Sequence, residues 1–189
     1  MESALIASHS DKSIVFFTEM LDEAAFDQIV TTRSCGELRR VLLERDFDLV
    51  IINAPLSDES GEGLARYITS KGVSQVILIV RSDHFDDISA VCEDDGVMVI
   101  ARPISRAAFW SALKLAKATQ SRLKRMQTEN SRLKQKIEDI RIVDRAKYIL
   151  ISHLTMSEQE AHRYIEKQAM DRRTSKRLIA EGIIKTYEN

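Results

Sequence analysis

The chain has 189 residues, a formal net charge of −1 and 44% hydrophobic residues, which allows one medium-sized domain and a smaller appendage. No apolar run approaches the roughly 18 residues that a membrane-spanning helix needs. The first residues, MESALIASHSD, lack the basic start and apolar core of a signal peptide. A membrane partner is therefore excluded from the expected functions, and we expect a cytoplasmic location.

The charges are distributed unevenly along the chain. Residues 1–108 hold 10 Lys/Arg and 19 Asp/Glu, a balance of −9, whereas residues 109–189 hold 18 Lys/Arg and 10 Asp/Glu, a balance of +8. An acidic part followed by a basic part predicts two separate roles, with the basic part facing a polyanion.

Five short apolar segments in the first part have the length and composition of β-strands. They cover residues 4–8, 28–32, 48–53, 75–80 and 97–101. Segments of helical periodicity separate them, and one begins after Ser34 with Glu37 three residues later, which is the pattern of a capping box. Strands that alternate with helices predict an α/β fold with a doubly wound, five-stranded parallel sheet.

The chain has no Gly or Pro between Ser105 and Ile142, which predicts one long helix. Within it, apolar residues and one Asn recur at alternating steps of three and four. The a positions are Leu123, Asn130 and Ile137, and the d positions are Met126, Leu133 and Ile140. A single Asn at an a position favours a parallel two-stranded coiled coil. We predict a homodimer through a stalk at residues 119–141. The alternative is a helix packed on its own chain, against which the polar flanks KRMQTENSRLKQK argue.

The pattern of residues 142–189 predicts a small helical domain, because two further helical segments follow the end of the long helix. The first of them begins with Ser157 and Glu160 at capping-box spacing. Its apolar stripe is predicted to include Tyr164, whose alternative role is that of an exposed ring on which an RNA base stacks. So short a segment makes a marginal core, and we expect the stalk to support it.

Residues suited to catalysis or metal binding do not form a recognisable pattern. Cys35 and Cys92 lie 57 positions apart, and we expect two reduced thiols. The four histidines, none paired at metal-ligand spacing, are His9, His84, His153 and His162. No Gly-rich phosphate loop and no Ser or Cys nucleophile motif is present. We therefore expect no metal, no cofactor and no enzymatic activity.

The first 118 residues resemble a response-regulator receiver domain. The resemblance rests on the stretches ALIASHSD, DLVIINAPLSDESG, QVILIVRSD and VMVIARPIS. It implies a sheet of order 2-1-3-4-5 with the site at the strand tips. The family transfers a phosphoryl group to an aspartate at the tip of the third strand. Two acids after the first strand hold Mg²⁺, a Thr or Ser follows the fourth strand, and a Lys follows the fifth.

This sequence departs from the receiver pattern at every reactive position. The acceptor position holds Asn53, whose amide cannot attack phosphorus, and the acid pair is replaced by Ser8 and His9. The hydroxyl position holds Val80, although Ser82 lies two residues on. The nearby acids with unmatched spacing are Asp11, Asp58 and Glu59. Residues 1–118 therefore predict a pseudo-receiver that is not phosphorylated and that binds a partner, dimerises or holds the stalk.

The lysine position of the receiver pattern holds Arg102. Pro103 follows it, as the family expects, and such a bond to proline is one that can be cis.

Residues 142–189 resemble the ANTAR domain, the RNA-binding module of transcription antitermination regulators. The motifs that carry the resemblance are Arg145-Ala146-Lys147, Leu150, Met156–Ala161 and Ala169–Arg173. Tyr148 departs from the small residue that many members carry. The resemblance implies three helices that bind paired RNA stem-loops in nascent transcripts and prevent a terminator hairpin.

The candidate RNA-binding residues are basic. A cluster precedes and enters the last helix, and it consists of Arg172, Arg173, Lys176 and Arg177. Such side chains and helix N-termini both favour phosphate oxygens, although the alternative is a solvated charged face. Lys147 is a weaker candidate, because its stem could be buried.

The sequence thus predicts a dimeric RNA-binding antitermination regulator, with two heads that match tandem stem-loops. The alternative is a receiver-like interaction or scaffold module whose helical tail binds a regulatory protein partner.

Overall fold

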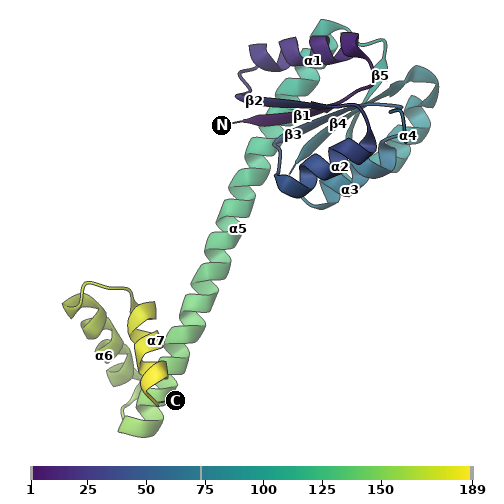
Figure 1. The fold of residues 1–189 in the computed structure, drawn as a ribbon. Coiled ribbons are helices and arrows are strands. Elements are labelled where there is room, and N and C mark those ends of the chain that lie inside the picture. Colours follow the sequence, from purple (N-terminus) through teal and green to yellow (C-terminus); the bar gives the residue numbers. More distant parts are fainter. Residues whose placement is uncertain (1, 73, 188–189) are drawn as a thin grey trace. The chain divides into compact units, whose positions relative to one another are not determined.

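The computed structural model describes residues 2–72 and 74–187. The predicted domain ranges also include residues 1, 73, 188 and 189, which lie outside the described residues. The chain forms two compact units, Met1–Arg125 and Met126–Asn189, and helix α5, Arg106–Leu154, contributes residues to both (Figure 1). Of the helices in the described ranges, none is long and apolar enough to cross a membrane.

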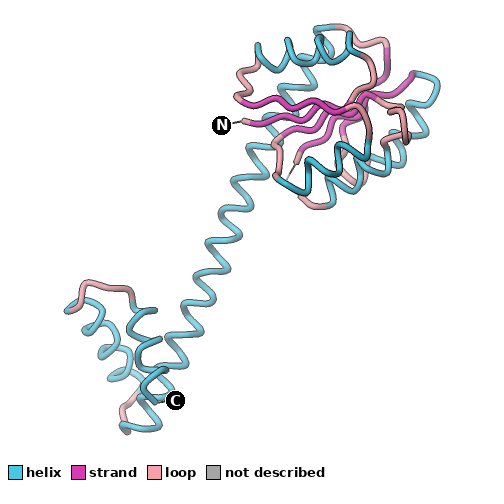
Figure 2. Tube along the Cα trace, viewed as in Figure 1, coloured by secondary structure: helices cyan, strands magenta, loops and turns pink. Residues whose placement is uncertain are grey.

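The first unit is built on a five-stranded parallel sheet, seen in magenta in Figure 2. Its strands are β1 Ser3–Ala7, β2 Gln28–Thr32, β3 Leu49–Asn53, β4 Gln75–Arg81 and β5 Met98–Arg102. The order is β2-β1-β3-β4-β5, and every neighbouring pair is parallel. The predicted fold class and strand order are confirmed.

Helices cover both faces of this sheet. They are α1 Asp11–Glu23, α2 Cys35–Glu44, α3 Glu62–Ser70, the short 3-10 turn η1 Ser82–His84, and α4 Phe85–Cys92. Helix α1 and the first turns of α5 pack on one face, and α2, α3 and α4 pack on the other. Because strand side chains alternate between faces, Ile51 and Ile52 are both fully buried in different cores. This double covering explains the continuous apolar runs of β3 and β4.

The hydrogen bonds at the N-terminus of α2 differ in one respect from the predicted capping box. Ser34 is the N-cap, and its hydroxyl accepts a hydrogen bond from the Glu37 amide at 3.1 Å. The Glu37 carboxylate, however, accepts from the amide of Arg33 at 2.8 Å rather than from that of Ser34. The prediction of a reciprocal capping box is therefore wrong, because the Glu37 carboxylate bonds to the amide of the residue before the N-cap.

The second unit is a three-helix domain formed by the remainder of α5, by α6 Glu158–Asp171 and by α7 Lys176–Tyr187. Its core consists of Ala146, Leu150, Ala161, Ile165, Ala169, Ile179 and Ala180. The small side chains of the four alanines let the three helices approach closely. The predicted capping box at the start of α6 is confirmed, since Ser157 and Glu160 exchange both hydrogen bonds.

Candidate nucleic-acid interface and receiver-type pocket

The pocket at the strand tips of the first unit contains a neutral pair of side chains. The Asn53 amide nitrogen donates to the Ser8 hydroxyl at 3.0 Å, and both residues are buried. The Ser8 hydroxyl also accepts from the Ser10 amide at 3.2 Å. The Asn53 carbonyl oxygen has no hydrogen-bond partner among the described residues. An amide and a hydroxyl thus occupy the positions where a phosphoryl acceptor and a metal ligand are expected from the receiver pattern.

Arg102 lies at the tip of β5, in the position expected for the receiver lysine. Its guanidinium donates to the carbonyl oxygen of Ala54, in the loop that follows β3. The Arg102–Pro103 bond is cis, as the sequence allows, and so is Ala54–Pro55, which was not predicted. The cation is thus engaged by a backbone carbonyl.

The remaining predicted pocket positions do not bring a reactive group into the site. Val80 is buried at the end of β4, and its side chain offers no hydroxyl. Ser82 is exposed in the turn η1, and His9 is exposed in the loop after β1.

The three nearby acids are occupied elsewhere. Asp58 accepts hydrogen bonds from the first two amides of α2 at 2.8 and 2.9 Å, which lowers the pKa of its carboxyl. Glu59 and Asp11 form ion pairs with Arg39 and Arg33. Over residues 2–72 and 74–187, no group of three or more His, Cys, Asp or Glu side chains is placed to hold a metal ion.

Both cysteines are free and buried in the core of the first unit. Burial raises the pKa of the Cys35 thiol to about 11, and it also raises the pKa of Cys92. A thiol with a raised pKa is a poor nucleophile, because only the thiolate attacks.

The predicted heptad residues form an exposed stripe on α5. In the single chain, exposed side chains occupy the positions Met126, Asn130, Leu133, Ile137 and Ile140, while Leu123 is half-buried. Four large apolar side chains at heptad spacing on one exposed helix face are the arrangement that a coiled-coil partner would cover.

The predicted basic cluster divides into two kinds of residue. Arg172 and Arg173 are exposed at the turn between α6 and α7, and within the described ranges no acidic side chain pairs with either. Arg173 has a φ of 49°, the left-handed conformation that ends the turn. Lys176, by contrast, forms an ion pair with Glu166 of α6.

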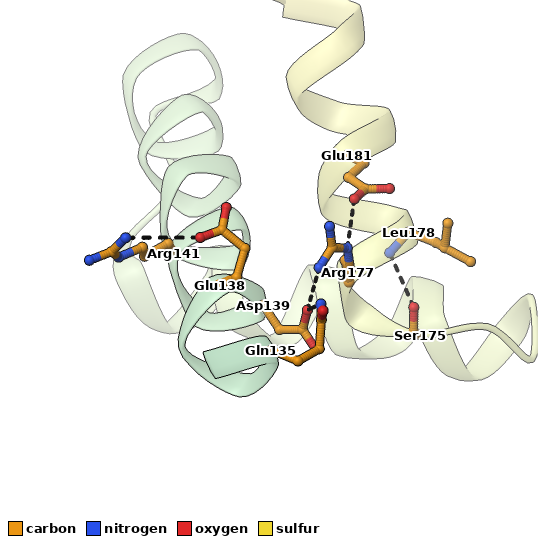
Figure 3. A network of polar contacts seen from close by, with 8 residues as sticks. All are labelled: Gln135, Glu138, Asp139, Arg141, Ser175, Arg177, Leu178 and Glu181. Atoms are coloured by element: carbon orange, nitrogen blue, oxygen red, sulfur yellow. Dashed lines mark hydrogen bonds and ion pairs between the residues drawn. The ribbon is translucent and has the colours of Figure 1, made fainter. Parts of the chain in front are cut away.

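Arg177 is held between two helices (Figure 3). Its guanidinium lies 2.7 Å from the carboxylate of Asp139 on α5 and 2.7 Å from that of Glu181 on α7. Hydrogen bonds from Gln135 and then from Arg177 lower the pKa of the Asp139 carboxyl. These contacts join α7 to α5 within the unit, so Arg177 stabilises the packing of the two helices.

Lys147 has the mostly buried position that the sequence left open. Its side chain is 16% exposed, and its ammonium lies 2.7 Å from Asp144 and 3.3 Å from Glu158. The hydrogen bond that Lys147 donates to the Asp144 carboxylate, together with the one it donates to Glu158, raises the pKa of Lys147. Lys147 therefore links α5 to the first turn of α6.

Tyr164 does not lie in the core. Its side chain is 40% exposed, whereas the buried stripe of α6 consists of Ala161, Ile165 and Ala169. The prediction of a core tyrosine is wrong, because the steps of four residues from 161 to 169 set the buried face and leave position 164 beside it. Arg163 and Lys167 are also exposed on α6. Sequence reasoning missed this basic pair, which the spacing of four residues beside a tyrosine could have indicated.

Both units have similar regions in known proteins. Residues 131–184 match the ANTAR domain family. Transcriptional regulatory protein PdtaR of Mycobacterium tuberculosis is 27% identical over 169 residues, which cover 89% of this chain and 82% of that protein.

Solved structures of receiver domains resemble the chain in fold. The signal receiver domain of an HD domain-containing protein from Pseudomonas fluorescens has a TM-score of 0.58 at 19% identity, over 66% of this chain and 92% of that one. A two-component transcriptional regulator from Clostridium phytofermentans has a TM-score of 0.59 at 16% identity, over 66% and 98%. At such identities the similarity establishes the fold alone.

Proposed function

We propose that this chain, whose last unit matches the ANTAR domain family and whose first unit has the receiver fold, is a regulator of transcription that binds RNA stem-loops as a homodimer in transcription antitermination. The observation that carries the proposal is the exposed pair Arg172 and Arg173, which no acidic side chain of the described part neutralises. Of the four clustered cations, these two are free to contact a polyanion without breaking an internal ion pair.

The surroundings of this pair favour phosphate. Arg172 and Arg173 precede the N-terminus of α7, the end of the helix that carries a partial positive charge, although the Leu178 amide there already donates to the Ser175 hydroxyl at 3.2 Å. Arginine offers several donors in a planar fork, so it can contact two phosphate oxygens or stack on a base. Arg177 is expected to contribute less to RNA binding, because its guanidinium already forms ion pairs with Asp139 and Glu181.

Dimerisation through the stripe on α5 completes the proposal. The stripe has Asn130 at an a position, which selects a parallel two-stranded coil at some cost in stability. A parallel dimer carries two identical ANTAR units, and one RNA with two stem-loops could then engage both. Binding of the first hairpin raises the effective concentration of the second, which increases the apparent affinity without a new kind of contact.

The receiver-type domain acts in this proposal without phosphorylation, and the chain without an enzymatic activity. The buried Asn53–Ser8 pair offers neither a nucleophile nor an anionic metal site. The domain keeps the sheet and its cores, so its role is to hold the stalk or to bind a regulatory partner. The site of action would be the cytoplasm, where transcripts emerge.

The proposal is tested by RNA binding of the purified full-length chain. Three RNAs of equal length are compared by fluorescence anisotropy: two tandem hairpins, one hairpin, and an unstructured strand. We expect tandem hairpins to bind best and the unstructured strand worst, with affinity falling as salt rises because phosphate contacts release counterions. Equal affinity for all three RNAs would contradict the proposal.

Sequencing of RNA crosslinked to the protein in cells separates this function from that of a protein-binding scaffold. An RNA-binding regulator is expected to yield reads concentrated on paired hairpins in leader regions. A scaffold whose helical tail binds another protein would yield no enriched RNA.

A further inference from the structure

A groove lies within the second unit between the end of α5, α6 and α7. It has a volume of about 370 Å³, within the range of about 300–1,000 Å³ that is typical of pockets for small organic groups. Its floor is apolar, with Leu150, Ile179 and Ile183. This groove is separate from the exposed heptad stripe, and no ion pair of Arg177 or Lys147 fills it.

Two tyrosines line this groove, and both are partly exposed. Tyr164 of α6 is 40% exposed and Tyr187 of α7 is 39% exposed. The Tyr187 ring contacts the ring of His153, with 5.3 Å between the ring centroids and 36° between the ring planes. Aromatic rings over an apolar floor provide flat surfaces on which a nucleobase can stack.

The charges at the groove suit a polyanion. Arg172 lines it, and among the described residues that line it none is acidic. A neighbouring hollow shares Tyr164 with the groove and is lined by Arg163 and Lys167. In the ranges 2–72 and 74–187, these three cations have no acidic partner. The acid in the hollow, Glu160, is engaged by the hydroxyl and amide of Ser157.

We propose that this groove accepts one unpaired base from the loop of an RNA stem-loop, which stacks on Tyr164 and Tyr187. The inference rests on the proposed RNA-binding function and names a subsite for it. Gln168, which also lines the groove, has both a donor and an acceptor for the edge of the base. Arg172, Arg163 and Lys167 contact the phosphates on either side of that base. A peptide is a poorer fit, because the groove combines π-faces with unpaired cations.

The test couples a change in the protein to a change in the RNA. Full-length parent protein and the Tyr164→Leu variant are each titrated with a hairpin whose loop nucleotides are made abasic one at a time. We expect one abasic position to weaken the parent by about tenfold or more, the typical effect of losing one stacked base. The Tyr164→Leu variant should bind intact RNA more weakly than the parent does, and it should lose less affinity with that abasic RNA than the parent loses, because the two changes share the stacking contact of Tyr164.

Matched controls separate stacking from general damage. Tyr164→Phe keeps the ring and should bind like the parent. Tyr148→Leu removes a tyrosine that is 70% exposed on α5 of the same unit and outside the groove, and it should also bind like the parent. The salt dependence of Tyr164→Leu should equal that of the parent, since no phosphate contact is lost.

The outcomes distinguish the subsite from the function. If the parent binds hairpins but is insensitive to every abasic loop position, the subsite is wrong and RNA binding stands. The same holds if Tyr164→Leu and Tyr187→Leu both bind intact RNA like the parent. If the parent binds no hairpin, the proposed function fails together with the subsite. If Tyr164→Leu melts at a lower temperature, the abasic series on the parent and the Tyr187→Leu variant decide the question.

Discussion

The strand-tip pocket of the first unit and the α6–α7 surface of the second differ in where their polar groups point. In the pocket, Asn53 donates to Ser8 and Arg102 donates to a backbone carbonyl, while the Asn53 carbonyl oxygen and Arg102 Nε have no hydrogen-bond partner among the described residues. On the surface, Arg172 and Arg173 face outward without an acidic partner in the described part of the chain. Groups that bond to each other inside a fold are not available to a ligand, whereas cations left unpaired on a surface are. On this ground the proposed function assigns RNA recognition to the second unit.

The largest expected effect comes from removing the unpaired cations. The double variant Arg172→Gln/Arg173→Gln should weaken hairpin binding by roughly a hundredfold or more, since each charge-assisted contact contributes about 1.5–3 kcal/mol. The control is Arg132→Gln/Arg141→Gln, which removes two cations that already lie near acids on α5. Anisotropy titrations measure both, and circular dichroism checks helicity. Parent-like binding by the first variant would remove the contrast between the two regions.

Loss of the coiled coil should have the next largest effect. Leu133→Glu places a charge at a d position of the exposed stripe and should yield a monomer that binds tandem hairpins no better than one, a loss of up to about a hundredfold in apparent affinity. Ser131→Glu adds the same charge off the stripe, so it should remain dimeric. Light scattering and titration with both RNAs provide the measurements. A dimeric Leu133→Glu protein would show that the stripe is not the interface.

A smaller effect, on the stability of the first unit, is expected when the carboxylate of Asp48 is removed. Its carboxylate accepts from the Ser3 amide at 2.9 Å and pairs with Lys124 of α5. Burial acts to raise the pKa of Asp48, but the hydrogen bonds from Lys124 and Ser3 outweigh it and hold the pKa below its usual range. The folded-state pKa is depressed, so this stabilisation is present above the unfolded-state pKa and is lost as pH falls through the folded-state value.

Asp48→Asn should therefore lower the free energy of unfolding of the first unit by about 1–2 kcal/mol at neutral pH. The difference from the parent should shrink between about pH 5 and pH 2. Urea titrations followed by the fluorescence of Trp110, the single tryptophan of the chain, report on this unit. The neighbouring exposed Asp46 supplies a control, Asp46→Asn, with no expected change. A pH-independent difference would mean that the Asp48 charge does not contribute.

No effect is expected when the first unit is offered a phosphoryl donor. Acetyl phosphate and Mg²⁺ should leave the parent unmodified, because Asn53 is no nucleophile and Ser8 and His9 provide no anionic metal ligand. Asn53→Asp should also remain unmodified, since the metal ligands would still be missing. Intact-mass measurement detects the addition of a phosphoryl group. An adduct within the first unit of the parent would show that the pocket retains its chemistry by another residue.

Local patterns in the sequence were sufficient for much of the architecture. Alternating apolar strands and helices predicted the five-stranded parallel sheet, and Ser157 with Glu160 predicted the start of α6. The loss of phosphoryl chemistry could be proposed from the identities at four strand tips, because an amide stays an amide in any fold. The inferences on the sheet and on the start of α6 succeed because they depend on neighbours along the chain. The loss of phosphoryl chemistry stays a prediction, which rests on the chemistry of single side chains.

Properties that depend on contacts between distant segments required the tertiary structure. The sequence grouped Arg172, Arg173, Lys176 and Arg177 as one cluster, but Asp139, 38 residues before Arg177, engages it, and Glu166 engages Lys176. Tyr164 likewise became a groove residue only when α7 was placed beside α6. Composition and periodicity by themselves determined the five strands, the long helix and the basic character of the last unit. Which cations remained free, and which ring remained exposed, was decided by packing, because charge neutralisation and burial depend on distances between helices.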